Sequence, residues 1–128
     1  MERRRISSAM PLEQTFGYSR ALVAGDRVFV SGTAPVMPDG ADPPADAYGQ
    51  ARRCLEIILA ALAEADAGPE DVVRTRLYVT SADHIDDVGK AHGEVFGDVR
   101  PATTGIVVAG LFDPRWLVEI EADAIIGP

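Results

Sequence analysis

The sequence of 128 residues contains one cysteine, Cys54, so an internal disulfide is excluded. It also lacks any apolar run that approaches the roughly 18 residues of a membrane-spanning helix. The basic start, "MERRRISSAM", is not followed by the apolar stretch of a signal peptide. From these absences we expect a cytoplasmic protein with a reduced thiol and no membrane partner.

Positive charge is also scarce. The chain has 12 basic and 20 acidic residues, which give a net charge of −8 at pH 7. Proteins that bind nucleic acids use a basic face to neutralise phosphates, so this charge argues against a nucleic-acid partner. The hydrophobic content of 47% and the charged content of 25% are typical of one globular domain. We expect a flexible N-terminal arm over residues 1–15 and a single domain over residues 16–128.

Hydrophobic periodicity and turn residues predict five strands and two helices. Strands are expected over 19–24 and 27–31 as a hairpin, then over 71–80, 103–111 and 116–126; helices are expected over 46–68 and 81–98; an exposed proline-rich loop is expected over 34–46. Each helix lies between strands and can serve as a crossover connection. We therefore expect an α+β fold, a mixed sheet with both helices on one face.

The predicted long helix carries one apolar stripe at helical spacing. Its members are Ala51, Cys54, Leu55, Ile58, Leu62 and Ala65. Because Cys54 lies on this stripe, core packing is favoured over a reactive thiol. His92 lies on the apolar stripe of the second helix and is interpreted as a core or interface histidine.

Charged residues line the face of the sheet that the helices leave uncovered. Arg74, Arg76 and Tyr78 share one face of their strand, and Glu119 and Glu121 share one face of the last strand. Cross-strand pairs of opposite charge can stabilise such a face in water. Alternatively, another subunit covers it, and the charges become buried groups that need partners.

Common catalytic patterns are absent from the sequence. His84 and His92 are eight positions apart, a spacing unsuited to binding one zinc ion from one helix turn. No phosphate-binding glycine motif is present, and Ser31 has no recognisable base nearby. Glu119 is the remaining catalytic candidate. It is either a carboxylate paired with a strand arginine or a group that orients a water molecule and transfers protons.

Several segments, in order and spacing, resemble the Rid family, also called YjgF/YER057c/UK114. They are "GYSRALVAGDRVFVSG", "QARRCLEIILAALAEADAGPEDVVRTRLYVT", "RPATTGIVVAGL" and "VEIEADAI". The resemblance implies a chorismate-mutase-like α+β fold and a homotrimer that holds small ligands in clefts between subunits. It also implies hydrolysis of reactive enamines and imines to keto acids and ammonia, without a cofactor; no metal site is expected from the sequence.

The resemblance is partial at the residues of the site. Tyr18, Gly32 and Glu119 match the family's cleft tyrosine, ligand-facing glycine and water-positioning carboxylate. Thr103, however, stands where the family's deaminases carry the arginine that binds the substrate carboxylate, and Gly105 replaces a frequent cysteine. A family asparagine on the second helix is replaced by Gly89.

These matches and departures leave three hypotheses. The first is a hydrolase with an altered substrate range, in which Glu119 acts on a ligand that lacks the usual carboxylate. The second is a small-molecule-binding trimer without catalysis, because fold alone does not settle function. The third, which the net charge disfavours, is an endoribonuclease or translation inhibitor.

Overall fold

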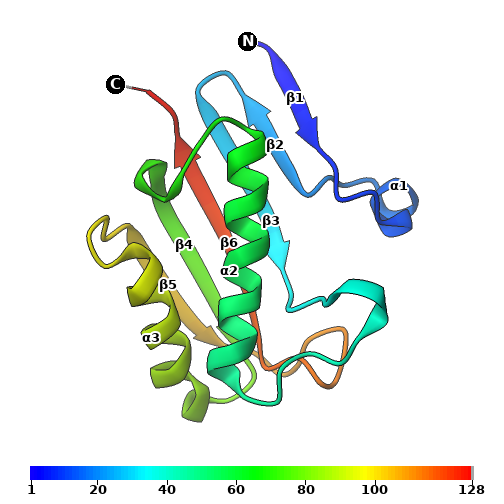
Figure 1. Cartoon of the computed structure of the whole chain (residues 1–128), viewed down its shortest axis with the longest axis vertical. Coiled ribbons are helices and arrows are strands. Elements are labelled where there is room, and N and C mark those ends of the chain that lie inside the picture. Colours follow the sequence, from blue (N-terminus) through cyan, green and yellow to red (C-terminus); the bar gives the residue numbers. More distant parts are fainter. Residues whose placement is uncertain (128) are drawn as a thin grey trace.

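The computed structural model describes residues 1–127 and consists of a six-stranded sheet with two helices packed across one face (Figure 1). The strands are β1 (Arg3–Ile6), β2 (Ala21–Ala24), β3 (Arg27–Thr33), β4 (Val72–Val79), β5 (Ala102–Val107) and β6 (Val118–Ile125); the helices are α1 (Pro11–Phe16), α2 (Ala47–Glu64) and α3 (Ile85–Phe96); short 3₁₀ turns lie at Pro38–Gly40, Pro69–Asp71 and Ala82–His84.

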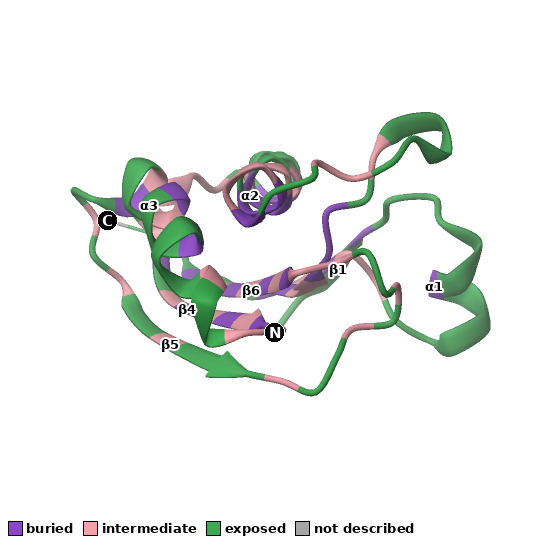
Figure 2. Ribbon diagram, turned by 90° about the horizontal axis from the view of Figure 1, so that it is seen from below, coloured by how far each residue is buried: buried purple, intermediate pink, exposed green. Residues whose placement is uncertain are grey.

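The sheet is mixed, with the strand order β1-β2-β3-β6-β4-β5. Only β4 and β5 pair in parallel, and α3 connects them as the crossover helix. Figure 2 shows α2 and α3 on one side of β4 and β6, while the opposite side carries no helix. The predicted α+β class is confirmed, and the homotrimer stays a prediction.

Local sequence signals account for most of the elements. The β2–β3 hairpin turns at Gly25, whose φ of +63° is the left-handed conformation that glycine adopts readily. Asp46 caps α2, because its side chain accepts a 2.8 Å hydrogen bond from the Gly49 amide. The hairpin, the long helix and the last strand were all predicted.

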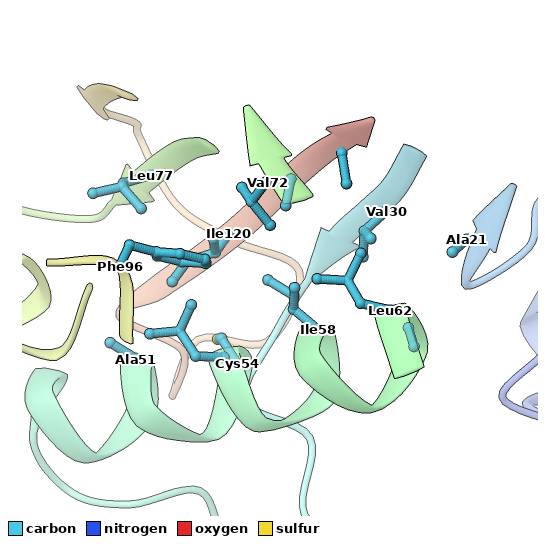
Figure 3. Close-up of a cluster of buried hydrophobic side chains, with 14 of the residues drawn as sticks. Ala21, Val30, Ala51, Cys54, Ile58, Leu62, Val72, Leu77, Phe96 and Ile120 are labelled. Carbon is cyan, nitrogen blue, oxygen red and sulfur yellow. The ribbon is translucent and has the colours of Figure 1, made fainter. Parts of the chain in front are cut away.

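The core lies between α2, α3 and the covered face of the sheet (Figure 3). All six residues of the predicted α2 stripe are buried. Ile58 and Leu62 face Val30 and Ile120 across the core, and Phe96 of α3 closes its other end. Full burial of one such aliphatic side chain contributes about 1.5–3 kcal/mol, so this stripe holds α2 on the sheet.

The first 15 residues differ from the prediction of a loose arm. Residues 3–6 form β1, which pairs with β2, and Ile6 is 5% exposed in the core. Arg4 donates a hydrogen bond to the Glu64 carbonyl at the end of α2. Pairing with a free sheet edge stabilises this arginine-rich strand, so local periodicity could not reveal it. The domain boundary at residue 16 stays a prediction.

The strand β5 is shorter than the strand predicted over 103–111. It is the edge of the sheet, and every residue in it is exposed or half-buried (Figure 2). A smaller difference affects β4, where a register shift between Val72 and Arg74 buries Val72 and exposes Val73. The later residues of β4 alternate as predicted.

The uncovered face carries the expected cross-strand pairs of charged residues. Arg76 lies 3.4 Å from the carboxylates of both Glu121 and Asp123, and the Tyr78 hydroxyl donates a 2.6 Å hydrogen bond to Glu121. All four side chains are half-buried within the single chain. Arg74 instead donates to the Thr104 hydroxyl at 3.2 Å. Glu119 has no ion pair with either strand arginine in the described residues.

Candidate functional site

Glu119 lies on β6 opposite Tyr78 and projects from the uncovered face of the sheet. Its carboxylate rests against Gly32 of β3, at the place where a larger residue would carry its Cβ atom. Glycine is therefore required at position 32 if this carboxylate is to keep its present position.

Arg20 also contacts this part of β3. Its Nη2 atom donates hydrogen bonds to the Ser31 carbonyl at 2.9 Å and to the Gly32 carbonyl at 2.6 Å. Its Nε atom is buried without a hydrogen-bond partner in the described residues. Burial lowers the pKa of Arg20, while Tyr18, Glu13 and Glu119 oppose that shift. Arginine nonetheless remains protonated in proteins, so a positive charge stands beside Gly32.

Burial raises the pKa of the Glu119 carboxyl. The charge of Arg20 partly opposes this shift, and the charge of Glu121 adds to it. A carboxyl group whose pKa is moved toward neutrality exchanges protons more effectively near physiological pH. We call Tyr18, Arg20, Gly32 and Glu119 the Glu119 cluster.

Tyr18 follows the left-handed Gly17 that ends α1, and its side chain is 42% exposed. It lines an open cavity of about 940 Å³ between the N-terminal segment and β2. The wall of this cavity is stabilised by Glu13, which accepts hydrogen bonds from the Ser7 hydroxyl and from the Ser8 amide and hydroxyl. Burial would raise the pKa of Glu13, but these hydrogen bonds outweigh it and lower that pKa.

Thr103 lies on the face of the sheet that the helices cover. Its hydroxyl is 2.8 Å from the Thr75 hydroxyl, which is in turn 2.8 Å from Nε2 of His92 on α3. The Thr103 hydroxyl also donates to the Pro101 carbonyl at 3.1 Å. Burial lowers the pKa of His92 and so favours its neutral form. We call Thr75, His92, Pro101 and Thr103 the Thr103 cluster.

The two other predicted differences from the family lie near this cluster. Gly105, two residues along β5, faces Ile85, and a Cβ atom there would lie 3.2 Å from Ile85 Cδ1. Gly89 lies on the exposed side of α3, where a Cβ atom would meet no neighbouring atom within 4 Å. A side chain larger than glycine therefore needs an adjustment of Ile85 at position 105 but none at position 89.

The structure therefore divides the predicted site residues into two sets. Arg20 connects Tyr18, Gly32 and Glu119, because it bonds the Gly32 carbonyl and its pKa responds to both Tyr18 and Glu119. Thr103 is joined to buried Thr75, whose neighbours on β4 alternate to the opposite face. A single chain thus holds the Glu119 cluster and the Thr103 cluster on opposite faces of one sheet.

Comparison with known families supports the resemblance. A family model described as "Endoribonuclease L-PSP" matches residues 9–126. The chain belongs to this family. Structures of family members also carry the names YjgF/YER057c/UK114 and Rid, so the recognition made from the sequence is confirmed.

Two similar family members cover almost the whole chain. An uncharacterised protein of Streptomyces coelicolor, SCO2049, is 42% identical over 124 residues, which cover 97% of this chain and 92% of the relative. The crystal structure of Rv2704 from Mycobacterium tuberculosis has 41% identity and a TM-score of 0.89, covering 98% of this chain and 100% of Rv2704.

A more distant family member has a functional name. TdcF from Escherichia coli, named as a candidate reactive intermediate deaminase, is 29% identical over 112 residues, which cover 84% of this chain and 85% of TdcF. A structure of TdcF with bound serine has 26% identity and a TM-score of 0.81, covering 97% of this chain and 94% of that chain.

Three further features of the chain bear on its function: the single cysteine, metal-binding side chains and the hydropathy of the helices. Cys54 is fully buried, its thiol lies 3.9 Å from the Val118 carbonyl, and burial raises its pKa, as expected for a core cysteine. Residues 1–127 contain no cluster of three or more side chains placed to hold a metal ion. Within the same range, no helix has the length and hydropathy to cross a bilayer.

Sequence reasoning missed Arg20, Thr75 and His92 as members of the site. Arg20 lies within the hairpin segment that carried the resemblance, but nothing local indicates that its side chain reaches the Ser31 and Gly32 carbonyls. His92 was assigned to an apolar stripe, and both His92 and Thr75 face the core side. Their hydrogen bond depends on how α3 packs over β4, which a local pattern does not encode.

Proposed function

We propose that this family member is a cofactor-independent hydrolase of small enamines or imines that lack a carboxylate at the position facing Thr103. The observation that carries the proposal is the half-buried carboxylate of Glu119, held against Gly32 beside the positive charge of Arg20. Such a carboxylate can orient a water molecule and exchange protons with it. The TdcF relative named for deamination supports the same reaction class.

The reaction needs one group that moves protons. Glu119 takes a proton from water as the water oxygen bonds to the electrophilic imine carbon, and it passes that proton to the imine nitrogen. The resulting carbinolamine gives its hydroxyl proton, through Glu119, to the nitrogen. The C–N bond then breaks, ammonia leaves and a carbonyl compound remains. Holding water and substrate together supplies much of the rate enhancement.

The substrate class follows from the missing cation at position 103. An arginine contributes charge-assisted hydrogen bonds to a carboxylate of about 1.5–3 kcal/mol each, against about 0.5–1.5 kcal/mol for a neutral hydroxyl. With Thr103 there, a carboxylate loses its main source of binding energy. We therefore expect neutral imines to be better substrates than imino acids.

The arrangement of the two clusters supports assembly from more than one chain. Glu119 and Thr103 occupy opposite faces of the sheet, so a cleft containing both requires two copies of the chain. The homotrimer implied by the family resemblance would meet this requirement, with the charged uncovered face as part of the interface. Sedimentation of the purified protein measures the number of subunits, and a monomer would contradict this arrangement.

The test of the hydrolase uses freshly generated imines, neutral and carboxylate-bearing, and follows ammonia release. We expect hydrolysis of neutral imines faster than in buffer, and a loss of about 10²-fold or more in Glu119→Gln. Glu56→Gln, the same change at an exposed position of α2, is the matched control and should retain activity. No acceleration by the wild type, or unchanged activity in Glu119→Gln, rejects the proposal.

A second candidate is a binding trimer without catalysis. It is favoured by the neutral character of the Thr103 cluster, whose hydroxyls are already bonded within the protein. Native mass spectrometry would then detect a bound metabolite that stays unchanged after long incubation.

The family description also names an endoribonuclease. The net charge of −8 disfavours RNA binding, so salt-sensitive RNA cleavage by the purified protein would be needed to support this activity.

A further inference from the structure

Three side chains of the Thr103 cluster form a continuous hydrogen-bonded chain that ends on the backbone. It runs from His92 Nε2 to the Thr75 hydroxyl, to the Thr103 hydroxyl and to the Pro101 carbonyl, over distances of 2.8, 2.8 and 3.1 Å. Thr75, in the middle, is 0% exposed, so water does not replace either of its partners. The inner part of the chain must therefore be satisfied by the protein itself.

The direction of the chain follows from counting protons. A carbonyl can only accept, so the Pro101 carbonyl takes the single hydroxyl proton of Thr103. Thr75 must then donate its own proton to Thr103, and it must accept one from His92. Neutral His92 is consequently protonated at Nε2 and unprotonated at Nδ1.

We infer that Thr103 presents a hydrogen-bond acceptor to the ligand, so that the site selects a group carrying N–H or O–H, such as a primary amide, over a carboxylate. The hydroxyl oxygen has two lone pairs, one occupied by Thr75, and Thr103 is exposed, so the second is free for a ligand. This inference rests on the proposed function, in which Thr103 contacts the ligand. It names the polarity of the contact: position 103 accepts where an arginine would donate.

A carboxylate is disfavoured here for two reasons. Its oxygens can only accept, so they face the free lone pair of Thr103 without a proton between them. Turning the Thr103 proton toward the carboxylate breaks the bond to the Pro101 carbonyl. An amide N–H has neither difficulty, because it donates to the free lone pair and leaves the chain intact.

The first experiment tests the direction of the chain without any ligand. Nitrogen-15 NMR of the intact protein reports which ring nitrogen of His92 carries the proton at pH 8. We expect the Nε2–H form, and we expect Thr75→Val to shift the Nε2 signal because its acceptor is removed. A proton on Nδ1 with a bare Nε2 overturns the assigned direction of the chain and the role of His92 as its donor, since Thr75 would then donate to His92 and Thr103 to Thr75.

The second experiment compares two matched probes, pyruvamide and pyruvate, which differ in an amide against a carboxylate. NMR titration should show about five-fold tighter binding of pyruvamide, the gain expected from one neutral hydrogen bond, with shifts at Thr103. Thr103→Val should abolish the preference and Thr103→Arg should reverse it. Thr104→Val is the matched control, because its hydroxyl bonds Arg74 on the opposite face, and it should keep the preference.

Three results of the titration overturn the inference. They are equal or tighter binding of pyruvate by the wild type, a preference that survives Thr103→Val, and no response of Thr103 to either probe at high concentration. Because no turnover is measured, these results are distinct from a failure of the hydrolase. Activity lost in every imine assay with the amide preference intact would reject only the catalytic proposal.

His92 acts in this account as a positioning residue behind Thr103. His92→Gln keeps an N–H donor for Thr75 and should retain the pyruvamide preference, whereas His92→Leu removes that donor and should reduce the preference. The unfolding free energy of each variant, measured together with binding, shows whether the substitution has disrupted the fold. An equal loss of preference in both variants would contradict the directional role of His92.

Discussion

The Glu119 cluster and the Thr103 cluster occupy opposite faces of the same sheet and differ in almost every physical respect. The first is charged, with a carboxylate and a guanidinium converging on the Gly32 peptide. The second is neutral, a chain of hydroxyls and an imidazole closed on a backbone carbonyl. In the proposed hydrolase, proton transfer and ligand selection would therefore depend on separate elements, and a change to one cluster should leave the other unaffected.

The largest expected effect comes from Gly32→Ala. The added methyl group would occupy the space of the Glu119 carboxylate and displace it. Because a misplacement of about 1 Å can cost about 100-fold in rate, we expect turnover of a neutral imine to fall by about that factor. The carboxylate is the mobile end of a side chain, so the free energy of unfolding should change by less than about 1 kcal/mol. Turnover equal to wild type would contradict the role of the Gly32 contact.

Arg20→Gln should affect both stability and pH dependence. Loss of the charged hydrogen bonds to the Ser31 and Gly32 carbonyls should lower the free energy of unfolding by about 2 kcal/mol. Removing a charge that lowers the pKa of Glu119 should raise that pKa further. The acid limb of the pH–rate profile, where Glu119 must lose its proton, should therefore move to higher pH.

Carbon-13 titration of the Glu119 carboxyl checks the change in pKa directly. Arg20→Lys, which keeps the charge, is the control and should leave that pKa closer to its wild-type value. Equal displacement of the pKa in both variants would show that the charge of Arg20 is not its cause.

Thr75→Val should weaken the Thr103 cluster without affecting the Glu119 cluster. The variant has nearly the same shape, but it leaves the His92 Nε2–H facing a methyl group in a half-buried position. An unsatisfied donor of this kind costs about 1–3 kcal/mol of unfolding free energy, measurable by urea denaturation. The pKa of Glu119 should stay unchanged, and a large shift in it would deny the separation of the two clusters.

Gly89→Ala provides a change outside both clusters. The residue lies within α3 with no neighbour in contact range, so alanine should raise the unfolding free energy by about 0.5–1 kcal/mol through helix propensity. Turnover and ligand preference should remain at wild-type levels. A drop in turnover would indicate that this side of α3 contributes to the site.

The smallest effect concerns the titration of His92. Burial lowers the pKa of His92 in the folded protein, so protonation favours the unfolded chain. Its contribution to stability is present above the unfolded pKa of about 6.5 and is lost as the pH falls through the lower folded pKa. His92→Gln should flatten the change in unfolding free energy between pH 8 and pH 5. If the unfolding free energy of His92→Gln depends on pH as it does in the wild type, groups other than His92 cause that dependence.

The sequence predicted those parts of the fold that local patterns encode. The stripe of Cys54, Ile58 and Leu62 specified α2 and its buried side, and alternation around Glu119 specified the two faces of β6. By contrast, β1 is an arginine-rich strand stabilised by its neighbour, and β5 is exposed at the edge of the sheet, where no strand of residues 1–127 pairs with its outer side. The pairing of β1 and the exposure of β5 depend on where each segment lies in the sheet, and the local sequence of a segment does not determine that position.

The sequence proposed residues for the site but not their arrangement. The resemblance pointed to Glu119, Gly32 and Thr103, and the structure places them on opposite faces of the sheet within one chain. Arg20 and the bond between Thr75 and His92 emerge only from tertiary packing.

The central claim is that the two clusters meet in one site only between different chains, and mixed oligomers test it most directly. Glu119→Gln lacks the proton-transfer group, and Thr103→Arg lacks the neutral ligand contact. Co-expressed, the two variants should form some sites with Glu119 from one chain and Thr103 from another. The account predicts neutral-imine turnover well above the sum of the separately purified variants. Turnover equal to that sum in verified mixed oligomers would contradict a site shared between chains.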